Sequence, residues 1–259
     1  MIIYLKFILV AGGLIIETVA ELDSLTDIEA GTPHDDLRTR VIVAAIELLT
    51  KSGRDAVTTR GVAEAAGIQA PTIYRLFGDK EGLLGAIAEH GFVSYLKTKK
   101  VREEGGDPVE NMRAGWDLHI EFGLSHPAIY LLMYANPRPG VKSPAAEISH
   151  CLLRSHIQRV AMVGRLLVNE EQAANLVHSA ACGTVLTLLG MPAEQRDMRL
   201  SELARDSVLS SITTTAPAVE SADYVTAAIT LRASLSDAAP LSKGERTMMI
   251  EWLDRLASG

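Results

Sequence analysis

The sequence predicts an all-α protein made of a small N-terminal part and a larger C-terminal part. After residue 35, apolar residues recur at spacings of three and four, which is the period of an amphipathic helix. No alternating apolar and polar run bounded by turn residues indicates a strand. With 259 residues, 47% hydrophobic and 22% charged, the chain is long and apolar enough to bury a sizeable core.

Residues 1–34 precede this helical pattern and form a predicted extension. Ile2–Ile16 is apolar apart from Lys6, yet it is shorter than the ~20 residues that span a membrane. It also lacks the cleavage site and the clearly basic start of a signal peptide. Three interpretations stay open: an upstream extension from a misassigned start, a segment that packs on the fold, and a membrane anchor. Residues 21–34 are typical of a flexible lead-in.

The N-terminal part, residues 35–104, is predicted to begin with an amphipathic helix from Leu37 that Gly53 closes. In the next stretch, Thr58 is a helix N-cap candidate and Gly67 supplies the positive φ that ends a short helix. A second short helix is predicted over Ala70–Phe77, and a longer one over residues 79–100. Two short helices joined by a tight turn with a glycine are a helix-turn-helix, whose second helix fits the major groove of DNA.

These residues resemble the N-terminal domain of the tetracycline-repressor (TetR) family of regulators. The resemblance covers about residues 37–92, and the matching positions are Thr58, Arg60, Val62, Ala63, Ala66, Gly67, Ile68, Thr72, Ile73, Tyr74, Phe77, Lys80 and Leu83. It implies a three-helix DNA-binding head followed by a helical domain that binds a ligand and forms a dimer. Four residues depart from the common family pattern: Gly61, Gln69, Arg75 and Gly82.

The C-terminal part, residues 105–259, begins after the break at Gly105-Gly106. Capping patterns at Asp107, Asn169 and Ser242 predict helix starts. Helices are expected over residues 107–126, 128–134, 143–167, 171–189, 197–213, 219–235 and 242–257.

The helix over Glu171–Leu189 has no charged residue between Glu171 and Glu194, so it must be covered on two sides. Its polar residues argue against a membrane span. We expect one side to pack on its own chain and the other on a second subunit, as the resemblance also implies. The expected interface residues are Ala173, Val177, Ala180, Ala181 and Thr184. The second interface helix is expected over residues 197–213, or alternatively over 219–235.

Aromatic residues concentrate between positions 116 and 134 and predict a pocket for an apolar or amphipathic small molecule. Ordinary core packing explains each single residue equally well. The expected ligand-binding residues are Trp116, His119, Phe122, Tyr130, Met133, Tyr134 and Arg154.

Catalytic and metal-binding patterns are not found in the sequence. The seven histidines make no HExxH pattern, and neither a P-loop, a Rossmann fingerprint nor a nucleophile elbow occurs. We therefore expect no catalytic residues, no metal and no cofactor. The two cysteines, Cys151 and Cys182, fit a reducing cytosol, and a cytoplasmic protein is expected.

The net charge of −7 is unevenly distributed, because residues 35–104 carry 11 basic and 10 acidic residues. The acidic excess therefore lies outside the head, which can bind DNA with a few placed cations. A homodimeric, ligand-released repressor of a palindromic operator is expected. The alternatives are a ligand-independent or activating regulator, and a helical binding protein or enzyme whose head no longer binds DNA. The expected DNA contacts are Thr58, Thr59, Arg60, Gln69, Ala70, Pro71, Thr72, Tyr74, Arg75 and Lys80.

Overall fold

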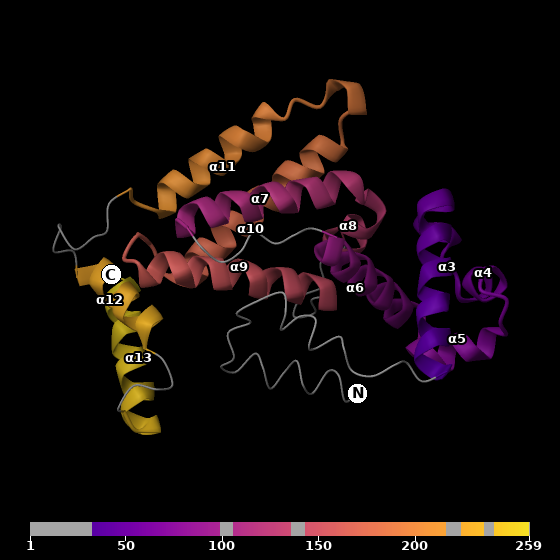
Figure 1. Ribbon diagram of the computed structural model, residues 1–259, viewed down its shortest axis with the longest axis horizontal. Coiled ribbons are helices and arrows are strands. Elements are labelled where there is room, and N and C mark those ends of the chain that lie inside the picture. Colours follow the sequence, from indigo (N-terminus) through magenta and orange to yellow (C-terminus); the bar gives the residue numbers. More distant parts are fainter. Residues whose placement is uncertain (1–32, 99–105, 136–142, 216–223, 236–240, 259) are drawn as a thin grey trace. The chain divides into compact units, whose positions relative to one another are not determined.

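The computed structural model describes residues 33–98, 106–135, 143–215, 224–235 and 241–258. These ranges are helices and turns, with one isolated backbone bridge, so the all-α prediction is confirmed. The contacts divide them into two units (Figure 1). The head unit contains residues 33–98, 121–135 and 143–149, and the body unit contains the remainder. The extension predicted over residues 1–34 falls almost wholly outside the described ranges.

Helices α3 to α6 and α8 build the head unit, and α7 and α9 each contribute one end to it. Their bounds are α3 Pro33–Ala56, α4 Thr59–Ala65, α5 Ala70–Phe77, α6 Lys80–Thr98, α7 Pro108–Ser125, α8 Pro127–Tyr134 and α9 Pro144–Met162. Helices α4 and α5 lie beside α3 and form the predicted helix-turn-helix (Figure 1).

The body unit contains the rest of α7 and α9 and the later helices. In it, α10 packs against α11, and α12 packs against α13. Their bounds are α10 Glu170–Leu189, α11 Arg199–Ile212, α12 Tyr224–Ser234 and α13 Lys243–Ser258, with a short 3-10 turn at Ala193–Gln195. Within the described ranges, no helix combines the length and apolarity needed to cross a membrane.

Capping side chains begin these helices where the sequence predicts. The Thr58 hydroxyl accepts the Gly61 N–H at 2.9 Å, and the Asn169 side chain accepts the Gln172 N–H at 2.8 Å. Ser242 and its partner three residues later bond reciprocally, at 2.8 and 3.3 Å. Each cap satisfies an N–H that the first helical turn leaves without a partner.

Glycines with positive φ interrupt two helices. Gly53 (φ 76°, ψ 179°) is non-helical and interrupts α3 where the sequence predicts a helix end, and a further turn continues to Ala56. Helix α9 ends at Met162 instead of near Leu167, because Gly164 (φ 71°) turns the chain. The following residues leave the helix to pair with the end of α11, where the Leu167 N–H donates to the Ile212 carbonyl at 2.9 Å.

The head core fixes the orientation of α5. Ile73 is fully buried, and Leu83 and Ile87 of α6 are buried with it in the core of the head. At the end of α5, the Arg38 guanidinium of α3 lies over the Phe77 ring, 5.3 Å from its centroid. Because the inner side of this eight-residue helix is held in the core, its opposite side is left to solvent.

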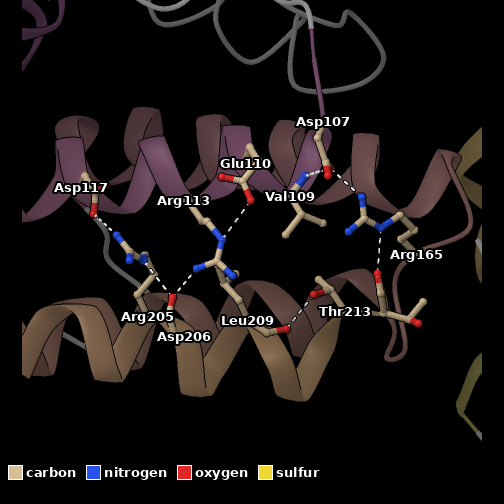
Figure 2. A network of polar contacts seen from close by, with 11 residues as sticks. Asp107, Val109, Glu110, Arg113, Asp117, Arg165, Arg205, Asp206, Leu209 and Thr213 are labelled. Atoms are coloured by element: carbon tan, nitrogen blue, oxygen red, sulfur yellow. Dashed lines mark hydrogen bonds and ion pairs between the residues drawn. The ribbon is translucent and has the colours of Figure 1, made fainter. Parts of the chain in front are cut away.

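A line of ion pairs joins α7 to α11 (Figure 2). Arg113 of α7 pairs with Asp206, and Arg205 pairs with Asp117 at 2.7 Å. Between them, the Trp116 indole N–H donates to the Ser201 hydroxyl at 3.0 Å in a buried hydrogen bond. The Arg205 and Arg113 guanidiniums hold the pKa of Asp206 below its usual value. One side of α11 therefore faces α7 and contacts it through these side chains.

Gly61 and Gly82, which depart from the family pattern, stand where a side chain would meet a backbone oxygen. A Cβ at Gly82 would lie 2.1 Å from the Phe77 carbonyl oxygen, and one at Gly61 would lie 2.9 Å from that of Ala56. Both separations are shorter than a van der Waals contact. The Gly82 N–H donates to the Asp79 carboxylate at 2.8 Å, so the cap of α6 forms without an acidic residue at this position.

Replacing Gly82 by alanine should therefore destabilise the head although alanine favours helices. We expect Gly82→Ala to lower the free energy of unfolding by ~1–3 kcal/mol, because the Phe77 carbonyl must move. Gly85→Ala in the same helix is the matched control, since its Cβ would meet Pro144 at an ordinary 3.9 Å. That control should raise stability by up to ~1 kcal/mol. Equal effects in urea denaturation would contradict the crowding argument.

Candidate nucleic-acid interface, subunit interface and ligand site

The outward face of α5 carries the side chains predicted to read DNA bases. Gln69 and Pro71 are exposed at the start of the helix, and Ala70 and Thr72 are partly exposed. Tyr74 keeps 54% of its surface accessible. A large, half-exposed aromatic side chain on a well-packed helix suits contact with a partner better than core packing does.

The two helices of the helix-turn-helix meet through hydroxyl groups. The Tyr74 hydroxyl lies 3.4 Å from the Thr59 hydroxyl, which places the first residue of α4 beside α5. Thr58 is exposed, and its hydroxyl already caps α4. We therefore expect Thr58 to contribute to DNA binding by capping the N-terminus of α4. The N–H groups and the helix dipole at that end favour binding of a phosphate.

Three cations surround this face. Arg60, Arg75 and Lys80 are exposed, and among the described residues none of them forms an ion pair. Guanidinium and ammonium groups that are not neutralised within the chain can bind phosphates.

Helix α10 has two different apolar sides. Four of the five expected interface residues are at most 6% exposed within this single chain: Ala173, Val177, Ala181 and Thr184. The fifth, Ala180, is half-buried. The four buried residues pack on the protein's own core and cannot reach a partner without rearrangement. Among the exposed residues of the helix, four follow a line with spacings of three and four: Leu176, Ser179, Gly183 and Leu186. The polar residues Gln172, Asn175 and Thr187 are exposed beside this line.

Helix α11 shows a matching exposed line. Its members also recur at spacings of three and four and carry no charge: Leu200, Leu203, Ser207 and Ser210. Leu203 is 64% exposed, the largest value among the exposed large hydrophobic residues described. This line was not predicted residue by residue, although its spacing is readable in the sequence. We call the two lines together the outer seam.

The residues expected to line a pocket divide between the two units. In the head unit, Phe122 packs on Phe92 and Tyr95, with ring centroids 5.0 Å apart in both pairs. Tyr130 packs on Tyr134 at 4.8 Å, and Phe122, Tyr130 and Met133 are buried. These rings pack against one another as side chains do in a hydrophobic core. Arg154 is exposed on α9.

The body unit holds three of the expected pocket residues: Arg154, and Trp116 and His119, which lie one turn apart on α7. Trp116 is 3% exposed and bonded to Ser201. His119 is enclosed by protein, and this burial, together with the charge of His178 on α10, lowers the pKa of His119 to about 4. The Cys182 sulfur lies 3.7 Å from both ring nitrogens of His178. Sequence reasoning missed His178 and Cys182 as neighbours of His119, because they lie on another helix.

Comparison with known proteins identifies the head. Residues 41–87 match the family model "Bacterial regulatory proteins, tetR family". The tetracycline repressor protein class A from transposon 1721 of Escherichia coli is 49% identical over 49 residues, which are 19% of this chain and 23% of that protein. The match thus spans about a quarter of that repressor's length.

Solved structures extend the likeness to most of the fold. A TetR-family transcriptional regulator from Haemophilus influenzae superposes with a TM-score of 0.53 and 20% identity, over 71% of this chain and 100% of that one. A protein of unknown function from Rhodococcus sp. RHA1 gives 0.57 and 22%, over 73% and 98%. The fold is therefore that of TetR-type proteins, a helix-turn-helix head followed by a helical domain.

The buried histidine predicts a specific pH dependence. The pKa of His119 is lowered in the folded protein, so between about pH 6.5 and pH 4 the unfolded chain binds a proton that the folded chain does not. Stability should therefore fall as the pH falls through this window. His119→Gln should remove up to roughly 3 kcal/mol of the difference in unfolding free energy between the two ends of the window. A pH series of urea denaturation curves measures this, and an unchanged slope would contradict it.

Proposed function

We propose that this chain, whose head belongs to the tetR family, is a DNA-binding transcriptional regulator that acts as a homodimer. It binds a palindromic operator through α5 and is released when a small molecule binds the helical body. The observation that carries the proposal is the exposed face of α5 with its three cations that form no ion pair. The match of residues 41–87 to the family model supports it independently.

The residues of the head divide into two proposed roles. Gln69, Ala70, Pro71 and Thr72 lie at the start of α5, which is the part of a recognition helix that contacts base edges. Tyr74, Arg75 and Lys80 offer hydroxyl and cationic groups for phosphates, with Thr59 and Arg60 at the start of α4. Phosphate contacts set the register of the protein on DNA, and base contacts provide specificity.

The outer seam supports a two-fold dimer. Its lines on α10 and α11 repeat every three or four residues, which is the spacing by which helices pack side by side. Ser179 and Gly183 on one helix leave room for close approach, and Leu203 on the other supplies a large apolar side chain. In a symmetric dimer the same seam is contributed by both copies and forms a four-helix contact.

Release by an effector requires that the effector bind the DNA-free arrangement more tightly than the DNA-bound one. We place the effector in the helical body, the unit that contains Trp116 and His119. A gel-shift assay with the DNA upstream of its own gene, with and without candidate small molecules, tests the proposal as a whole. The absence of any sequence-dependent shift would contradict it.

Removing one phosphate contact should reduce the salt dependence of DNA binding. Lys80→Ala should weaken binding about equally for all sequences, and lower the slope of log affinity against log salt by about one unit. Tyr74→Phe should weaken binding without changing the slope. Lys243→Ala, an exposed lysine at the start of α13, is the control. If fluorescence anisotropy shows the same slope for the Lys80 variant and the parent, Lys80 makes no phosphate contact.

Charges on the outer seam should separate the subunits without unfolding them. Leu203→Glu and Leu186→Glu place a carboxylate on a surface that solvent reaches in the single chain but that a dimer would bury. Sedimentation velocity should show folded monomers, with unchanged helical circular dichroism. Met248→Glu, on an equally exposed position of α13, should leave the dimer intact. Ala181→Glu should instead unfold the chain, because Ala181 is 4% exposed.

A further inference from the structure

The recognition helix α5 is too short to hold its own direction. It has eight residues, and its N-cap residue, Gln69, makes no side-chain hydrogen bond to the first turn. An isolated helix of this length is not stable in water, so contacts with other helices must fix both its position and its direction. Its backbone packs on α4 and α6. Ile73, at the middle of α5, is fully buried and attaches the helix to the core of the head.

One buried side chain at the middle of a short helix fixes its position but leaves it free to tilt. A tilt of about 10° around Ile73 would move the start of α5 by about 1 Å, because ~6 Å of helix lies on each side. Such a shift exceeds the tolerance of well-placed hydrogen bonds to base edges. The Thr59 and Tyr74 hydroxyls are 3.4 Å apart, which is long for an O–H···O bond, so they restrain this tilt weakly. A second fixed point near one end of α5 is therefore needed.

Phe77 and Arg38 supply that second point at the end of α5. Phe77 is the last residue of the helix, and its side chain is half-buried. The Arg38 guanidinium of α3 lies over the Phe77 ring, 5.3 Å from its centroid, which is within the range of an attractive cation–π contact. Gly78 follows with a φ of 80°, so α5 ends there and Phe77 is the last of its side chains that can be packed.

Arg38 interacts with α5 and α6 from a position on the packed face of α3. It lies one turn before Val41 and Ile42, which are at most 1% exposed. Its charge reaches α6, since burial raises the pKa of the Glu89 carboxyl and the Arg38 charge opposes that rise. A guanidinium can stack its flat face on a ring while its charge attracts a carboxylate. One side chain of α3 thus acts on the recognition helix and on the helix that follows it.

We propose that Arg38 is a positioning residue for DNA recognition: by covering the Phe77 ring it fixes the direction of α5, and with it the base specificity of the head. The inference rests on the proposed function, because it concerns the helix that reads the operator. Arg38 acts through Phe77 and needs no contact of its own with DNA. Its loss should therefore lower the preference for the operator over other sequences, and leave the affinity for other sequences and its salt dependence unchanged.

Fluorescence anisotropy on the full-length protein measures this preference with two duplexes: the DNA upstream of its own gene, and a scrambled duplex of equal length and composition. Arg38→Met and Phe77→Leu should each lower the ratio of the two affinities by about three- to tenfold. Arg38→Lys keeps the charge but cannot stack a planar group on the ring, so it should lower the ratio as well. Arg40→Met, which changes an exposed arginine of the same helix, is the matched control and should leave the ratio unchanged.

A double-mutant cycle decides whether Arg38 acts through Phe77. The variant with both Arg38→Met and Phe77→Leu should show no lower ratio than the more affected single variant, because each change removes the same contact. Additive effects, or an unchanged ratio in the single variants, would overturn the proposal. So would an equal loss of affinity for both duplexes with a salt slope reduced by about one unit, since Arg38 would then bind a phosphate. If Arg38→Met does not fold, the cycle is built with Arg38→Lys.

Hydrogen exchange of the DNA-free protein separates this inference from the proposed function. Mass spectrometry of peptides that cover α5 should show amide exchange about threefold faster or more in Arg38→Met and in Phe77→Leu, with no further increase in the double variant. Peptides from α10 should exchange as in the parent. Faster exchange of α5 in a protein that binds no DNA supports the positioning of α5 and removes the regulatory function. DNA binding by the parent, with exchange and base preference unchanged in the variants, removes only the role of Arg38.

Discussion

Helix α10 imposes the constraint on which the body of this protein depends. Between Glu171 and Glu194 it carries no charged side chain, so neither side of the helix is strongly hydrated. The chain covers one side itself, with Ala173, Val177 and Ala181 in the core. The other side remains exposed and carries Leu176 and Leu186. This is the side that the proposed dimer would cover.

The position of α11 follows from polar contacts with α7. Arg113, Trp116 and Asp117 of α7 bond to Asp206, Ser201 and Arg205, which together occupy one side of α11. Exposed ion pairs contribute little to stability, typically 0.2–1 kcal/mol each. The buried indole bond is different, because removing one partner leaves a buried polar group unsatisfied. These contacts between α7 and α11 therefore act mainly by orientation: they leave Leu200 and Leu203 on the exposed side of α11.

Sequence reasoning succeeded where the determining interactions are local. The caps at Thr58, Asn169 and Ser242 involve residues three apart, so their residue types and spacing suffice. Its reach is shorter where a helix has two apolar faces. Four of the five α10 residues that were expected to contact a partner subunit are buried in the single chain. Periodicity shows that both faces are apolar, but which face meets which neighbour depends on helices distant in the sequence. His178 and Cys182 were missed beside His119 for the same reason.

Helix α7 has residues in both units and contacts a different helix in each of them. It carries His119 within one turn of Trp116, whose indole is bonded to α11. A few residues further on, Phe122 packs against Phe92 and Tyr95 of α6, the helix that follows the recognition helix. Both contacts are made by residues of one helix, Pro108–Ser125, so coupling between them would pass through this element. Such coupling needs two arrangements of α7 that differ in effector affinity, since a ligand that binds both equally shifts nothing.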